Sequence, residues 1–90
     1  MAMISLGKKI RLYALKRQFH RNPSVVLLQE YFEAKTGLKP NYHQVHAMVY
    51  ALTGRTYIWR PRSGKTTFLA AMSDIIGDRM SYLDSDSLDA

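Results

Sequence analysis

The most informative segment of the sequence is Tyr57-Ile58-Trp59-Arg60-Pro61-Arg62-Ser63-Gly64-Lys65-Thr66-Thr67-Phe68-Leu69. A short β-prone run meets a basic loop broken by proline, and an apolar helix-forming run follows the loop. Backbone N–H groups in such a loop can converge with a helix N-terminus on a bound anion. The stretch therefore predicts a strand, an anion-holding turn over Ser63 to Thr67, and a helix.

The tripeptide Gly64-Lys65-Thr66 has the residue types found in nucleotide-phosphate loops. In those loops the lysine reaches the β- and γ-phosphates, and the hydroxyl that follows it binds Mg²⁺. The consensus also has a glycine five residues before Gly64, and Trp59 stands at that position. The match is partial, and the alternative is a basic loop in which Gly64 supplies flexibility alone.

Composition indicates one small globular domain of 90 residues. Residues 1–36 form a basic and apolar helical pair, and residues 37–90 carry the loop, its helix and an acidic end. The sequence has no cysteine, which excludes disulfides and thiolate metal sites, and it has no apolar run of the roughly 20 residues that a membrane span needs. With no evident secretory signal, we expect a cytoplasmic protein, or one of the host cytoplasm if it is viral.

Charge is distributed unevenly along the chain, whose net charge is +6. Twelve Lys and Arg precede Ser73 against only Glu30 and Glu33, and the other five acids follow it. A basic body favours a polyanionic partner such as nucleic acid, although basic character can also serve solubility alone.

The first expected helix, Ser5 to Arg21, contains bases and no acid. Its apolar residues spread around the helix, so we expect it to contact more than one neighbour. The candidate nucleic-acid-binding residues are the bases Lys8, Lys9, Arg11, Lys16, Arg17 and Arg21. The alternative is a solvated basic face.

Capping residues and glycines predict the other elements. Asn22 and Pro23 are expected to start a helix that ends at Gly37, and Asn41 a helix that ends at Gly54. The remaining elements are a strand over residues 55–59, a helix over residues 64–76 and a strand over residues 80–83. If both strands form, we expect them to be parallel, with the last helix as a right-handed crossover.

Taken together, these features resemble the opening of the phage large-terminase (DNA-packaging) and DEAD-box-like helicase ATPases. The resemblance rests on Leu38-x-Pro40-x-x-x-Gln44, a helix, Gly54, Tyr57-Ile58-Trp59 and Gly64-Lys65-Thr66-Thr67, and it covers about residues 37–76. It implies that ATP and Mg²⁺ bind, with Gln44 contacting adenine and Arg60 or Arg62 sensing phosphate charge. It also implies that Ser63, Gly64, Lys65 and Thr67 hold the phosphates and that Thr66 holds the metal.

The chain departs from this family after the loop. No convincing acidic strand follows, and Asp84 after residues 80–83 is a weaker counterpart, placed as in ParA-like ATPases. We therefore expect an incomplete P-loop-like α/β unit of about four helices and two short strands. Such a unit would bind nucleotide or nucleic acid but hydrolyse ATP poorly or not at all, and no catalytic residue is assigned. A protein partner or self-association would complete the sheet. The alternative is an all-α basic interaction protein, for example a viral one, whose loop and first helix grip nucleic-acid phosphates.

Overall fold

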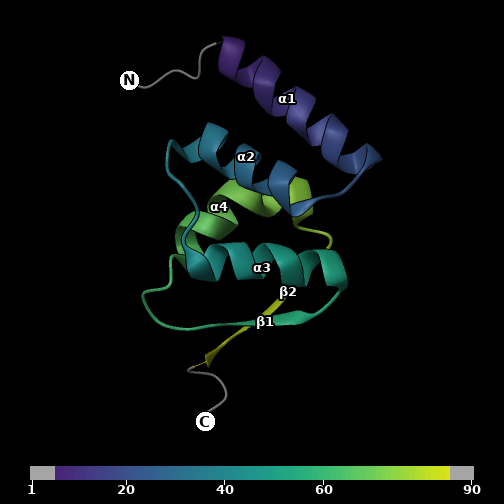
Figure 1. Cartoon of the computed structure of the whole chain (residues 1–90). Coiled ribbons are helices and arrows are strands. Elements are labelled where there is room, and N and C mark those ends of the chain that lie inside the picture. Colours follow the sequence, from purple (N-terminus) through teal and green to yellow (C-terminus); the bar gives the residue numbers. More distant parts are fainter. Residues whose placement is uncertain (1–5, 86–90) are drawn as a thin grey trace.

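The part of the chain that the structure describes folds into four helices and two short parallel strands (Figure 1). The computed structural model describes residues 6–85. The elements in chain order are α1 (Leu6–Arg21), α2 (Val25–Thr36), α3 (Tyr42–Thr53), β1 (Thr56–Trp59), α4 (Lys65–Ile76) and β2 (Ser81–Asp84). The helix-rich α/β arrangement agrees with the coarser part of the prediction, and the all-α alternative is wrong because β1 and β2 pair.

One hydrophobic core holds the four helices together. α2 packs against α1, α3 and α4, and α3 also packs against β1. Each helix contributes large side chains that are almost completely buried, namely Phe19, Leu28, Phe32, Met48, Phe68, Met72, Ile75 and Ile76. Burial of such side chains is the main favourable term in folding, so the loop between β1 and α4 is carried on a packed scaffold.

The predicted boundaries of α3 are confirmed. Asn41 adopts an extended conformation and its side chain accepts a hydrogen bond from the Gln44 N–H, while the Gln44 side chain accepts one from the Asn41 N–H. This reciprocal pair is a capping box. Gly54 ends the helix with a φ of 71°, and Gly37 ends α2 in the same left-handed conformation.

The predicted start of α2 at Asn22 and Pro23 is wrong. Asn22 donates its N–H to the Gln18 carbonyl oxygen over 2.9 Å, so it closes the last turn of α1. The cap is Ser24, whose hydroxyl accepts from the Leu27 N–H over 3.2 Å. The Asn22 N–H is thus hydrogen-bonded to α1, and Pro23 lies between α1 and α2.

α1 lies on α2 at the end of the molecule remote from the strands (Figure 1). It begins at Leu6, and the predicted first residue, Ser5, lies outside the described residues. Its buried residues are Leu15 and Phe19. α2 is the main neighbour of α1, and Arg79, in the segment between α4 and β2, lies 5.5 Å from the centre of the Phe19 ring.

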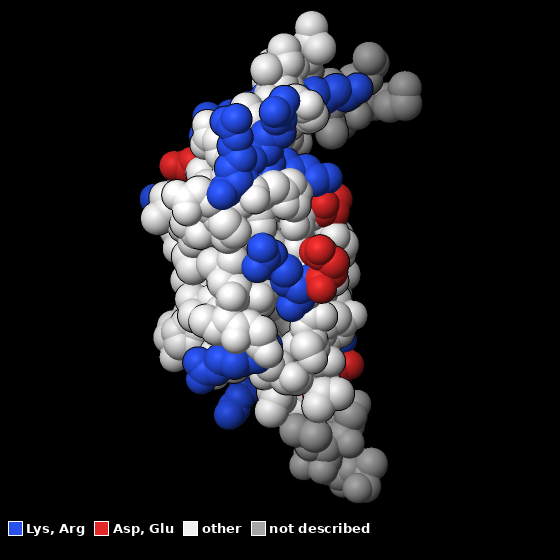
Figure 2. Space-filling view, turned by 90° about the vertical axis from the view of Figure 1, so that its right-hand side faces the viewer, with Lys and Arg blue, Asp and Glu red and all other residues white. Residues whose placement is uncertain are grey.

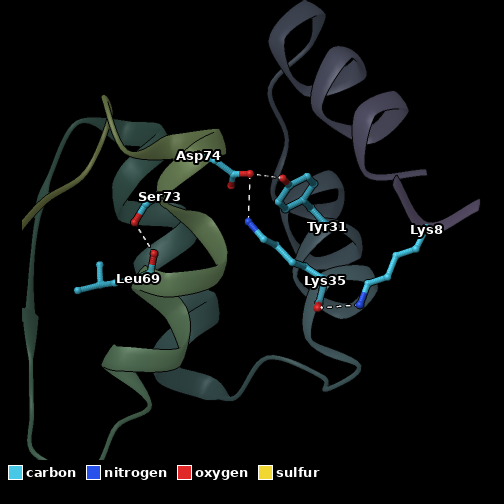
Figure 3. Close-up of polar contacts among 6 residues, drawn as sticks. All are labelled: Lys8, Tyr31, Lys35, Leu69, Ser73 and Asp74. Carbon is cyan, nitrogen blue, oxygen red and sulfur yellow. Dashed lines mark hydrogen bonds and ion pairs between the residues drawn. The ribbon is translucent and has the colours of Figure 1, made fainter. Parts of the chain in front are cut away.

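Hydrogen bonds and a salt bridge tie α2 to α4 (Figure 3). The Tyr31 hydroxyl donates to Asp74 over 2.7 Å, and the Lys35 ammonium lies 3.0 Å from the same carboxylate oxygen. Burial raises the pKa of Asp74, but the hydrogen bonds from Tyr31 and Lys35 outweigh burial and hold it below its ordinary value. The Lys8 ammonium donates to the Lys35 carbonyl oxygen over 3.1 Å, which connects α1 to the end of α2.

β1 and β2 are parallel, as expected, with Thr56 opposite Ser81 and Trp59 opposite Asp84. Both strands begin one residue later than predicted. For β1 the reason is that the Arg55 N–H donates to the Tyr50 carbonyl oxygen at the end of α3. The face that carries Trp59 packs on α3 and α4.

The other face of this sheet is bare over the described residues. Ile58 and Leu83 lie opposite each other on it, and they are 46% and 47% exposed. Parallel sheets are usually covered on both faces, and a two-stranded sheet is marginal in isolation.

Candidate anion-binding site

A hollow of about 370 Å³ lies at the turn that connects β1 to α4. It is formed by the turn and by the end of β2, with the lining residues Trp59, Arg60, Pro61, Arg62, Ser63, Gly64, Lys65, Thr66, Thr67 and Asp84. The hollow therefore lies beyond the carboxyl ends of both parallel strands. Ligands of open α/β sheets bind at this edge.

The turn owes its shape to two left-handed residues on either side of Ser63. Arg62 has a φ of 60° and Gly64 a φ of 83°. The Ser63 hydroxyl donates to the Arg60 carbonyl oxygen over 2.5 Å, and Ser63 is only 3% exposed. A non-glycine residue in the left-handed region is uncommon and is found where the surrounding structure holds it, often at functional sites.

Two amide side chains of α3 hold the turn by its carbonyl oxygens. The Asn41 side-chain amide donates to the Ser63 oxygen over 3.1 Å, and the Gln44 amide donates to the Gly64 oxygen over 2.9 Å. The same two side chains form the capping box of α3, so each uses both its oxygen and its nitrogen. One pair of residues thus fixes the start of α3 and the turn before α4.

Gly64 is required at its position for steric reasons as well as for its conformation. A Cβ atom there would lie 2.6 Å from the Gln44 amide nitrogen and 2.9 Å from the Asn41 amide nitrogen. Any side chain would therefore push the turn away from α3. The interpretation that Gly64 supplies flexibility alone does not account for this close approach.

The N-terminus of α4 faces the hollow without a side-chain cap. Ser24 caps α2 and Asn41 caps α3, whereas Gly64 gives α4 no side-chain hydrogen bond. The first N–H groups of a helix have no partner within the helix, and they carry the positive end of its dipole. The N–H groups of residues 64–67 are therefore suited to an anion.

Three cationic side chains border the hollow. Arg60 and Arg62 are exposed, and Lys65 is half-buried. The Lys65 ammonium is ion-paired with the carboxylate of Asp84 and lies 5.5 Å from the centre of the Tyr82 ring. Because Asp84 lies opposite Trp59 in the strand register, it stands at the rim of the same hollow.

The oxygen donors at the hollow suit Mg²⁺, although they are few. The Thr66 hydroxyl and the Asp84 carboxylate both come from lining residues, and oxygen ligands are what Mg²⁺ prefers. Within residues 6–85, no group of three or more His, Asp or Glu side chains could hold a metal ion. Mg²⁺ at this position would depend on phosphate oxygens and water for its other ligands.

The structure brings together all but one of the residues predicted to bind the nucleotide. Arg60 through Thr67 line the hollow. Gln44 does not, because it lies beneath the turn, 4% exposed, with its amide engaged by Asn41 and Gly64. The sequence singled out Asn41 as a helix cap and missed its contact with the turn. The signal was present, since Asn-x-x-Gln is a capping-box pattern that leaves both NH₂ groups free to donate elsewhere.

The six bases of α1 do not share one face. Lys8 and Lys16 are half-buried, whereas the others, Lys9, Arg11, Arg17 and Arg21, are exposed. Figure 2 shows Lys and Arg side chains gathered over the end of the molecule where α1 lies. The strands lie at the opposite end, so α1 and the hollow are separate basic regions (Figure 1). None of the helices among residues 6–85 is both long and apolar enough to cross a membrane.

Comparison of the chain with protein families, with curated proteins and with solved structures finds no match. The assignment of a function therefore rests on the geometry of the hollow and on the chemistry of its residues.

Proposed function

We propose that this protein is a phosphate-binding module that holds the phosphates of a nucleotide in the hollow between β1 and α4, in the manner of a P-loop ATPase. The observation that carries the proposal is the convergence of Arg60, Arg62 and Lys65 on the uncapped N-terminus of α4. Backbone N–H groups and cationic side chains together are what a phosphate chain requires. The phosphates would take the place of Asp84 as the partner of Lys65.

ATP with Mg²⁺ is the ligand that the family resemblance implies, and the lining residues fit it. Thr66 would hold the metal from the first turn of α4, with Asp84 as a second oxygen donor. The two arginines would offset the charge of the terminal phosphate.

We propose binding with little or no hydrolysis. Phosphoryl transfer depends on a group that orients the attacking nucleophile. Asp84 is the one carboxylate among the described lining residues, and it is already ion-paired with Lys65. A partner protein or a second copy that packs on the bare face at Ile58 and Leu83 would cover the sheet and could supply what the site lacks.

Calorimetric titration with inorganic triphosphate and with Mg-ATP tests the proposal. Lys65→Ala should weaken binding of both by about tenfold or more, because it removes a charge-assisted hydrogen bond to phosphate. Lys9→Ala removes the same charge from an exposed position on α1 and should leave both affinities unchanged. Equal affinities for Lys65→Ala and the unmodified protein would overturn the proposal.

A second candidate function is nucleic-acid binding through α1. The observation that favours it is the concentration of bases on α1, which has no acid along its length. Neutralised phosphates release counterions, so the affinity for DNA or RNA should fall steeply as salt rises. Replacing exposed Arg17 and Arg21 by glutamine should reduce that salt dependence. A salt dependence equal to that of the unmodified protein would argue against α1 as the contact.

A further inference from the structure

We infer that a second hollow, between α2 and α4, receives the nucleoside of the nucleotide whose phosphates lie at the β1–α4 turn. This inference rests on the proposed function. The second hollow measures about 400 Å³ and is lined by Lys35, Thr36, Thr66, Thr67, Ala70 and Ala71. The second hollow is a shallow depression that is open to solvent, so a nucleoside there would be covered on one side by the protein.

The two hollows adjoin at the first turn of α4, because Thr66 and Thr67 line both. A ligand anchored by its phosphates at the turn can therefore extend past these two threonines along α4. Single inorganic phosphates would not reach this second hollow.

The walls of the second hollow present apolar surface with one cation at the edge. Ala70, Ala71 and the threonine methyl groups supply the surface. Lys35 supplies the cation, which Asp74 holds in place over 3.0 Å (Figure 3). Apolar surface of this kind suits a nucleobase, because packing the flat face of the base on it removes apolar surface from water.

These walls should accept different bases with similar affinity. Discrimination between bases needs hydrogen bonds to their edges. The Thr36 hydroxyl already donates to the Phe32 carbonyl oxygen over 2.7 Å and accepts from the Leu38 N–H. Gln44, the residue that the family resemblance assigns to adenine, lines neither hollow. We therefore expect ATP, GTP, CTP and UTP to bind alike.

The test compares ATP with inorganic triphosphate on two variants. Ala70→Trp fills the second hollow from an exposed position, and Ala14→Trp makes the same change at an exposed alanine of α1. In the unmodified protein, ATP should bind about tenfold more tightly than triphosphate, the difference expected if the base removes roughly 50–60 Å² of apolar surface from water. Ala70→Trp should remove this difference and leave the triphosphate affinity unchanged, and Ala14→Trp should change neither.

The outcomes separate this inference from the function on which it rests. An ATP advantage that survives Ala70→Trp would overturn the inference while leaving the phosphate site in place. ATP binding much more tightly than GTP, CTP and UTP would also overturn it and would favour recognition of adenine by its edge. Failure of triphosphate itself to bind would overturn the proposed function, and the inference with it.

Discussion

Gln44 donates a hydrogen bond from its side-chain amide to the carbonyl oxygen of Gly64, over 2.9 Å and across 20 residues of sequence. The same amide accepts a hydrogen bond from the Asn41 N–H at the start of α3. The turn that precedes α4 is therefore held by the residue pair that begins α3. The shape of the anion-binding hollow depends on this link.

Replacing Gln44 should destabilise the protein. Gln44→Ala leaves the Gly64 oxygen and the Asn41 N–H, both partly buried, without their partner, which costs about 1–2 kcal/mol in the free energy of unfolding. Gln18→Ala makes the same change on the exposed side of α1 and should cost less than about 0.5 kcal/mol. Urea unfolding measures both, and equal losses would mean that Gln44 does not secure the turn.

Gly64→Ala should cost more than Gly54→Ala. Both glycines have a positive φ, so alanine at either position should lower the free energy of unfolding by about 1–2 kcal/mol, because alanine disfavours the left-handed conformation. A Cβ at position 64 would also collide with the two amide groups from α3, whereas one at position 54 has nothing within 4 Å. We expect an additional loss of about 1–3 kcal/mol for Gly64→Ala, from the hydrogen bonds it displaces. Equal stabilities of the two variants in thermal or urea unfolding would contradict the close approach of Gly64 to the side chains of Asn41 and Gln44.

Tyr31→Phe should destabilise the protein more at neutral pH than at pH 3. The Tyr31 hydroxyl and Lys35 hold the pKa of Asp74 below its ordinary value of 3.8 against the opposing effect of burial. A carboxyl with a lowered pKa in the folded state stabilises above its ordinary pKa, and this stabilisation is lost as pH falls through the folded-state pKa. The loss at pH 7 should be about 1–2 kcal/mol.

The control for Tyr31 is Tyr13→Phe, which removes a hydroxyl from an exposed tyrosine of α1. Its effect on the free energy of unfolding should be small at both pH values. If the effect of Tyr31→Phe were the same at pH 3 as at pH 7, the ionised form of Asp74 would not be the partner that matters.

Asp84→Asn should increase the affinity for inorganic triphosphate in the absence of Mg²⁺. Asp84 engages Lys65 and places a negative charge at the rim of the hollow. Removing that charge should tighten binding by about two- to fivefold, the size expected of a solvent-screened charge pair. Asp78→Asn changes an exposed carboxylate beyond the end of α4 and should have no effect. A weaker affinity for Asp84→Asn would show that Asp84 supports the turn instead of competing with the phosphates.

Local signals in the sequence were sufficient for most of the fold. Residue type predicts the helix caps at Asn41, Gly37 and Gly54, and it also predicts the order of β1, turn and α4. Each of these features depends on residues that are close together along the chain. The start of α2 was misplaced because two candidate caps, Asn22 and Ser24, stand close together. Only the way in which α1 ends decides between them.

Part of the candidate site could be predicted from the sequence for the same reason. Lys65 and its neighbours form one continuous stretch, so their position around a turn follows from the strand and helix on either side. The position of Gln44 beneath that turn is a tertiary contact, whereas the family resemblance implied that Gln44 faces a ligand. The second hollow lies between α2 and α4, and no spacing of residues in the sequence predicts that Thr36 and Thr67 line the same hollow.

Amide chemical shifts under titration with inorganic triphosphate test the central claim most directly, because they report on each backbone N–H of the turn. We predict saturable shifts at Ser63 through Thr67 in the unmodified protein, and their loss in Lys65→Ala. Shifts confined to α1, or none at Ser63 through Thr67 at millimolar triphosphate, would contradict an anion-binding turn between β1 and α4.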